Sequence, residues 1–160
     1  MSEMTVSAAG AVLRLDTETL ALTICAGNTE WRSAEEPRIA WKDGRETLFR
    51  EAGQIRHSLW ETGVGSGLRS RYEGFSQDGK DTGFAFETIV WVEASTGDVF
   101  FEWLPLSEGE AAVKAVYWPA AFGFEKKSGS WYSLLNYEQG LLIPNDWPEE
   151  LGRIPFEGQL

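Results

Sequence analysis

The sequence contains one cysteine and one histidine among its 160 residues. A single cysteine has no partner for a disulfide within the chain. One histidine and one cysteine also fall short of the three or four nitrogen and sulfur ligands that zinc requires. Cys25 lies in an alternating apolar run, and His57 lies in a segment that alternates polar and apolar residues. We therefore interpret both as structural residues and expect no zinc site and no cofactor.

Basic residues and long hydrophobic runs are also scarce. The 14 Lys and Arg residues are outnumbered by 25 Asp and Glu residues, which gives a net charge of -11. Such a charge repels phosphate backbones, so we expect no nucleic-acid partner. Residues 116–124 form the longest apolar stretch, which is shorter than the ~20 residues that span a bilayer, so we expect no membrane partner. Residues 1–10 lack the basic start and apolar block of a secretory signal, which predicts a cytoplasmic protein.

Helical periodicity is hard to find, and short runs rich in β-branched and aromatic residues recur between clusters of Gly, Asp and Asn. About ten strands are more than one open sheet holds comfortably, so the predicted fold class is all-β, an antiparallel two-sheet β-sandwich. We predict one sandwich domain at residues 1–143 and an extended tail or linker at residues 144–160. The expected strands are residues 11–15, 19–25, 38–41, 46–49, 54–61, 68–75, 84–93, 99–104, 112–117, 131–135 and 140–143.

Two connections predict hairpins. Asp16-Thr17-Glu18 is a short polar link between two apolar runs, and Asp43-Gly44 offers the positive φ angles of a tight turn. Residues 84–93 and 99–104 are the most apolar segments. We predict that both are central strands buried on both faces.

The motifs of the chain do not form a complete catalytic centre. The glycine-rich segment at residues 63–67 is not followed by Lys-Ser/Thr or by a helix, so it predicts a strand connection and not a phosphate loop. Most carboxylates, such as Glu35 and Glu36, fall in predicted turns, where solvation explains them. Asp146 and Glu149 are of more interest because Trp147 lies between them, although neighbouring positions do not establish a facing pair.

Tryptophan is abundant, with 8 residues in the chain. An indole combines a flat apolar face with one N–H donor and suits stacking on a sugar ring. Trp60, Trp91 and Trp103 lie within predicted strands, so we assign them to packing. Trp118, Trp131 and Trp147 lie in or beside loops, where a contact surface and a core role explain them equally well. We take these three residues as candidate interface anchors or sugar platforms, and the Asp146 carboxylate as the candidate acceptor for a sugar hydroxyl.

Three segments carry a family resemblance. They are Leu13 to Leu20 leading to Glu30-Trp31, Gly65 to Tyr72, and Trp131 to Pro144 with its Gln-Gly-Leu-Leu-Ile-Pro ending. The chain resembles the N-terminal domain of large bacterial glycoside-hydrolase-like proteins. The resemblance implies a galactose-mutarotase-like supersandwich, with the catalytic carboxylates in a barrel domain that follows it. Aldose mutarotases use a pair of histidines, and His57 alone does not fit that pattern, so mutarotase activity is not expected.

Three functional hypotheses follow. The first is a non-catalytic sandwich domain of a glycoside hydrolase, which packs on a downstream catalytic domain of the same polypeptide and contributes to carbohydrate binding. The second is a freestanding carbohydrate-binding module. The third is a small carboxylate-dependent enzyme that uses Asp146 with Glu149 or another acid.

Overall fold

The computed structural model describes residues 3–109, 112–124, 132–135 and 141–144. The chain divides into two compact units, Met1–Glu125 and Lys126–Leu160. Strands dominate the described residues, which confirms the predicted all-β class.

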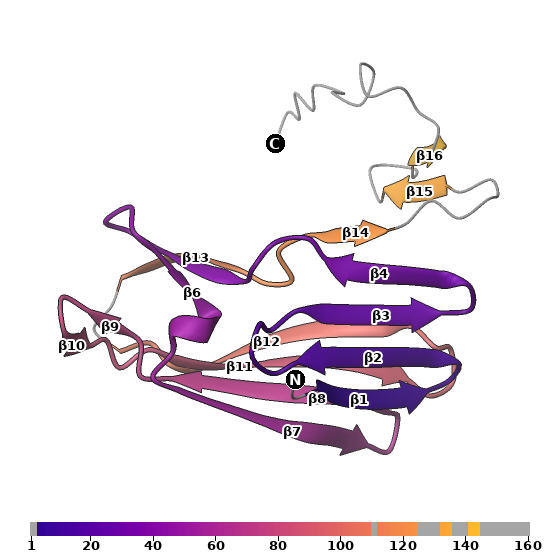
Figure 1. Cartoon of the computed structure of the whole chain (residues 1–160), viewed down its shortest axis with the longest axis horizontal. Helices are drawn as coiled ribbons and strands as arrows, with labels where there is room; N and C mark the ends of the chain where they lie inside the picture. The colour runs from indigo at the N-terminus through magenta and orange to yellow at the C-terminus, as the bar shows by residue number, and fades with distance from the viewer. Residues whose placement is uncertain (1–2, 110–111, 125–131, 136–140, 145–160) are drawn as a thin grey trace. The chain divides into compact units, whose positions relative to one another are not determined.

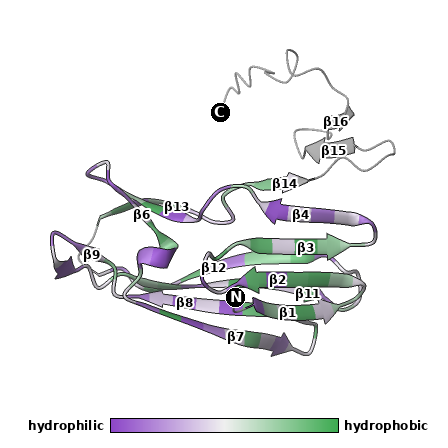
Figure 2. Cartoon of the chain, viewed as in Figure 1, coloured by the Kyte–Doolittle hydropathy of each residue, from purple (hydrophilic) through white to green (hydrophobic). Residues whose placement is uncertain are grey.

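A five-stranded antiparallel sheet forms one layer of the first unit (Figure 1). Successive strands pair as hairpins, with Leu13 opposite Ile24 and Ile24 opposite Trp31. Alternate residues of the second strand are buried, as expected when one face of a sheet lies on a core. The strand order is β1 (Glu3–Ala8), β2 (Ala11–Asp16), β3 (Leu22–Ala26), β4 (Thr29–Ser33) and β14 (Phe122–Phe124). Figure 2 shows hydrophobic colour on β2 and β3 and hydrophilic colour at the end of β4.

A four-stranded antiparallel sheet forms the opposing layer. Its order is β12 (Val99–Ser107), β11 (Ala85–Glu93), β8 (Gly65–Glu73) and β7 (Gln54–Thr62). β11 is buried on both faces over its first six residues, as predicted. The same prediction for residues 99–104 is wrong, because β12 lies at the edge of this sheet in the described part of the chain and Phe100 and Leu104 are exposed.

A third, three-stranded sheet has the order β13 (Val113–Tyr117), β5 (Arg38–Trp41) and β6 (Glu46–Leu48). The β5–β6 hairpin turns at Asp43-Gly44, where Gly44 has a φ of 90°, as the sequence predicts. A 3-10 helix at Phe49–Glu51 follows β6. A short hairpin of β9 (Ser76–Gln77) and β10 (Lys80–Asp81) precedes β11.

Two hydrophobic clusters lie on the inner face of the four-stranded sheet. The first joins this sheet to the five-stranded sheet, since Leu68, Val90 and Val92 contact Leu13 and Ile24. The second lies under β5 and the 3-10 helix and is largely aromatic. Its buried residues are Leu20, Ile39, Trp41, Phe49, Tyr72, Phe75, Phe84 and Phe86. Burial of each large side chain contributes roughly 1.5–3 kcal/mol, so these clusters hold the covering sheets on the four-stranded sheet.

The second unit contains a hairpin of β15 (Tyr132–Leu135) and β16 (Leu141–Pro144), close to the predicted strands at 131–135 and 140–143. Pro144 ends β16, and the rest of the predicted tail lies outside the described residues.

Several element boundaries differ from the prediction. β1, β4 and β14 were not expected, and β8 begins at Gly65 and not at Leu68. Thr19, Leu20 and Ala21 were predicted to belong to the strand at residues 19–25, but they lie in the connection before β3, where Leu20 has a φ of 62°.

Candidate functional site

Trp118 is the only one of the four predicted binding residues that falls within the described residues. It follows β13, is half-buried, and packs against both hydrophobic clusters. Its ring lies edge-on to Phe101, with the ring centroids 5.6 Å apart. Trp131, Trp147 and Asp146 lie outside the described residues. The placement of the predicted group as a whole is therefore untested, and its carbohydrate contacts stay a prediction.

Three other aromatic residues form a row on the outer face of the four-stranded sheet. The strand registers place Trp60, Trp91 and Phe100 on one face of the sheet. Trp91 is paired with Phe100 of β12 and with Gly67 of β8. Gly67 is in turn paired with Trp60 of β7. The ring centroids of Trp60 and Trp91 are 5.1 Å apart. Those of Trp91 and Phe100 are 4.7 Å apart, with the planes inclined by 19°. We call these three residues the aromatic row.

The three strand tryptophans assigned to packing lie in two different environments. Trp103 packs against the second cluster, as expected for a packing residue. Trp60 and Trp91 are half-buried on the opposite face of the sheet, outside both clusters. Alternation alone did not show this, because β11 is apolar at nearly every position and hides the period of two.

Two glycines of β8 make room for the row. A Cβ atom at Gly65 would lie 2.6 Å from Cε3 of Trp91, and a Cβ atom at Gly67 would lie 2.5 Å from Cβ of Trp91. The Trp91 side chain therefore lies directly over the backbone of β8. The indole Nε1 donates a hydrogen bond of 2.7 Å to Oε1 of Glu102 on β12, which fixes the orientation of the ring.

A charged group flanks the aromatic row on the same face. Glu87 is opposite Arg71 in the register and accepts hydrogen bonds of 2.9 and 2.6 Å from Nε and Nη2 of Arg69. The Glu87 side chain is only 4% exposed, whereas that of Arg69 is 45% exposed. Arg71 pairs mainly with Glu73, at 2.7 Å, and this pairing raises the pKa of Arg71. The face thus combines apolar rings with fixed hydrogen-bonding groups.

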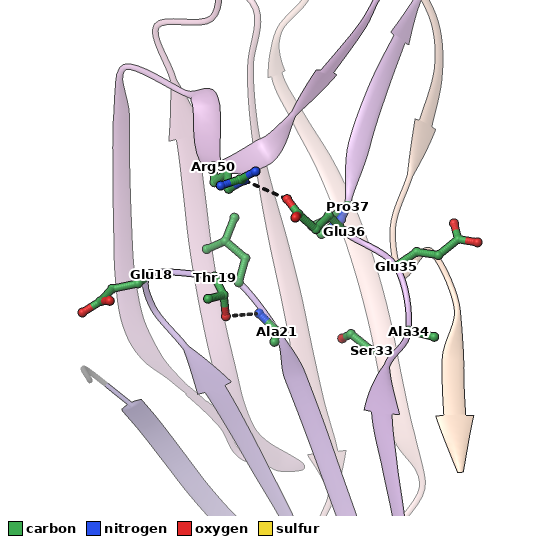
Figure 3. Close-up of a pocket in the computed structure, with 10 residues that line it drawn as sticks. Glu18, Thr19, Ala21, Ser33, Ala34, Glu35, Glu36, Pro37 and Arg50 are labelled. Atoms are coloured by element: carbon green, nitrogen blue, oxygen red, sulfur yellow. Dashed lines mark hydrogen bonds and ion pairs between the residues drawn. The ribbon is translucent and has the colours of Figure 1, made fainter.

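A shallow hollow lies at one end of the five-stranded sheet, between the β2–β3 connection and the segment before β5 (Figure 3). Its volume is about 230 Å³. Glu36 forms an ion pair of 2.7 Å with Arg50, while the side chains of Glu18 and Glu35 point to opposite sides in Figure 3. The hollow therefore does not present two facing carboxylates, the arrangement that glycoside hydrolysis requires.

Among the described residues, every carboxylate whose pKa departs from its ordinary value has a lowered pKa, which favours the charged form. Backbone N–H groups of Thr19 and Glu18 lower the pKa of Asp16, and hydrogen bonds from Arg45 lower that of Asp43. A general acid needs the opposite, a raised pKa. These carboxylates therefore serve as turn and ion-pair acceptors.

His57 and Cys25 have ordinary structural surroundings. Nδ1 of His57 lies 2.8 Å from the hydroxyl of Ser70, and burial lowers the pKa of the imidazole. Burial raises the pKa of the Cys25 thiol, which donates to Oε2 of Glu30 at 3.5 Å. A raised pKa disfavours the reactive thiolate, so both positions agree with the structural roles inferred for them.

Within the described ranges, no three His, Cys, Asp or Glu side chains gather in a way that would hold a metal ion. Within the same ranges, no helix is long and apolar enough to cross a membrane.

Neither the known protein-family models nor the curated proteins contain a match to this chain. Solved structures do match, among them structures of alpha-N-acetylgalactosaminidase NagBb from Bifidobacterium bifidum. Its complex with GalNAc is 37% identical, with a TM-score of 0.73 over 91% of this chain and 22% of that chain. Its complex with Gal-NHAc-DNJ is 38% identical, with a TM-score of 0.74 over 91% of this chain and 23% of that chain. A quadruple mutant gives 37% identity and a TM-score of 0.72.

The chain spans less than a quarter of the length of the enzyme that it matches. It is thus similar to a segment of a larger glycoside hydrolase, which agrees with the family resemblance found in the sequence.

Proposed function

We propose that this chain is a non-catalytic β-sandwich domain of a glycoside-hydrolase-type protein. In this role it packs on a catalytic domain of the same polypeptide and contributes contacts to carbohydrate. The observation that carries the proposal is the partial match: 91% of this chain aligns with only 23% of the NagBb chain, at 38% identity.

The chemistry of the described residues supports a non-catalytic role. Two carboxylates that line the hollow form ion pairs with arginines, Glu35 with Arg38 at 3.0 Å and Glu36 with Arg50 at 2.7 Å. Glu87, the most buried carboxylate of an ion pair, is held by Arg69. A carboxylate engaged in this way is a poor nucleophile and a poor proton donor.

Carbohydrate contacts within this role are assigned to Trp118, Trp131 and Trp147, with Asp146 as an acceptor for a sugar hydroxyl. Tryptophan suits both a sugar contact and a domain interface because it is large, rigid and amphipathic. Trp118 is half-buried, so the two clusters that it packs against do not cover the residue completely.

An activity assay tests the non-catalytic role. The purified chain should release no chromophore from a chromogenic alpha-N-acetylgalactosaminide above the rate in buffer. Turnover by the chain that disappears in the Asp146→Asn or Glu149→Gln variant would contradict the proposal and support a small carboxylate-dependent enzyme.

The freestanding carbohydrate-binding module is the second candidate, and the exposed aromatic side chain of Phe100 on β12 favours it. A module of this kind binds glycans without help from another domain. Saturable glycan binding by the isolated chain would support it, and flat titrations against a glycan panel would contradict it.

A further inference from the structure

In the described part of the chain, four strands lie at the edges of the two large sheets, and three of them carry features that hinder further pairing. β14 has only three residues, and β12 contains Pro105 and an irregular register with β11. β7 carries the charged residues Arg56 and Glu61. β1 has no Pro, Lys or Arg, and its register with β2 is regular over all six residues. Native edge strands are normally short, bulged or charged, so the edge of β1 indicates a partner strand.

The sheet beneath β1 extends beyond it. β1 packs over β8, and β7 is the next strand outward (Figure 1). Leu59 of β7 is paired with Leu68, whose side chain lies in the first cluster, so Leu59 also faces inward. Leu59 is nevertheless 59% exposed. We call the uncovered inner surface of β7 at Leu59 and Glu61 the ledge.

A hollow of about 210 Å³ lies between β1 and the ledge. Its lining includes Val6 and Ser7 of β1 and both residues of the ledge. Neighbouring strands of a sheet are about 4.8 Å apart. A strand added beside β1 would therefore lie over β7, fill the hollow and cover Leu59.

We infer that the free edge of β1 pairs with one extended peptide segment, which adds a strand to the five-stranded sheet above the ledge. A strand paired on one side directs the N–H and C=O groups of alternate residues to its free side, where an added strand can bond them. The segment belongs to the larger polypeptide of the proposed function, since this chain aligns with only 23% of the NagBb chain. The inference rests on the proposed function only for this source.

The overhang of β7 excludes a second copy of the sandwich at this edge. In a two-fold pair joined through β1, each β1 would lie over the β7 of the other copy. Each β7 would then need the place beneath the other copy's β1, which β8 already occupies. A single strand without a second layer avoids this clash.

The side chains beside the hollow define the chemistry of the segment. Leu59 favours apolar residues on the face toward the ledge. The exposed carboxylates of Glu3 and Glu61 lie on the two bordering strands, and the net charge of the chain is -11. Side chains alternate between the faces of a strand, so a segment that alternates apolar with basic or polar residues fits.

Residue-resolved hydrogen exchange by NMR tests the inference on the isolated chain. The probe is an acetylated peptide of alternating valine and lysine, and the control peptide is N-methylated at every backbone amide and cannot donate hydrogen bonds. We expect the β1 amides that do not bond to β2 to exchange rapidly in the free chain. The probe should slow them about tenfold, as for the gain of one hydrogen bond each. The N-methylated peptide should not slow them.

A pair of variants locates the binding to the ledge. Leu59→Ser should weaken binding of the probe about tenfold, because an apolar contact is lost. Val64→Ser is the matched control and should leave binding unchanged. Val64 is 57% exposed, lies in the turn of the same β7–β8 hairpin and is not part of the lining of the hollow.

The larger polypeptide tests the source of the segment. Its β1 amides should be protected without the probe, and the probe should not bind, because the edge is already paired. Rapid exchange of these amides in the larger polypeptide would overturn the inference.

Four results with the isolated chain would also overturn it. They are protection of the β1 edge without any probe, no slowing by the probe, equal slowing by the N-methylated peptide, and equal weakening by the two variants. In the first case, sedimentation would show whether a second copy or the chain's own residues cover the edge. Turnover of a chromogenic glycoside by the isolated chain would instead contradict the non-catalytic function and leave the strand addition intact.

Discussion

The ion pair between Arg69 and Glu87 offers a quantitative test of the four-stranded sheet. Glu87 accepts hydrogen bonds from two nitrogen atoms of a single guanidinium, and its side chain is 4% exposed. We consider Arg69→Met, which keeps most of the apolar stem of the side chain and removes its charge. The variant leaves a nearly buried carboxylate with one remaining cation, Arg71, whose Nη1 lies 3.9 Å from Oε1 of Glu87.

The expected loss of stability lies between two limits. Exposed ion pairs contribute about 0–1 kcal/mol, whereas removing one partner of a fully buried pair costs about 3–5 kcal/mol. Arg69 is 45% exposed, so water and Arg71 compensate part of the lost interaction. We therefore expect Arg69→Met to lower the free energy of unfolding by about 2 kcal/mol.

Urea unfolding followed by circular dichroism measures this change. A double-mutant cycle with Glu87→Gln isolates the pair, and we expect a coupling energy of about 1–2 kcal/mol. Arg56→Met is the matched control, since Arg56 is an exposed residue of β7 that bonds Gln54. A loss below about 0.5 kcal/mol for Arg69→Met, no larger than an ordinary surface change, would refute the reasoning.

Two further predictions concern the same sheet. Gly67→Ala should destabilise the protein by at least about 2 kcal/mol in urea unfolding, because its Cβ would collide with the Val90 carbonyl and with Trp91; Gly63→Ala, with nothing within 4 Å, is the control, and equal effects of the two would contradict this account. Burial lowers the pKa of His57 below its ordinary 6.5. The unfolded chain therefore binds a proton more readily than the folded chain, and the free energy of unfolding should fall as pH drops from about 6.5 toward the lowered pKa. His57→Gln should flatten this part of the profile, and an unchanged slope would show that other groups cause it.

Local signals account for the parts of the fold that the sequence predicts well. Asp43-Gly44 specifies a tight turn through its own backbone preferences, and β5 is found at the predicted residues 38–41. β1 was missed because its side chains are half-buried at alternate positions and exposed between them, so that it lacks an apolar run. β4 was missed for a similar reason, since Glu30 and Arg32 interrupt it.

The candidate site depends on information that is not local. Whether Trp91 faces the core or the outside is decided by the pairing of β11 with β8 and β12, and the sequence of β11 is apolar on both faces. The one available signal was Gly65 and Gly67, whose missing side chains leave room for a large neighbour across the strand. The resemblance to a larger glycoside hydrolase came from short sequence segments, and the solved structures agree with it over most of the chain.

The pairing of β14 with β4 and of β13 with β5 has a consequence for synthesis on the ribosome. Phe122 pairs with Ser33 and Val116 pairs with Ile39, so each contact joins residues far apart along the chain. β4 and β5 are synthesised before these partners. The strand edges that the partners cover stay unpaired until the partners have been translated. Open strand edges invite pairing with other chains, and distant pairings form slowly. Until β13 and β14 have been made, the nascent chain therefore exposes the strand edges of β5 and β4 that these two strands cover in the folded protein.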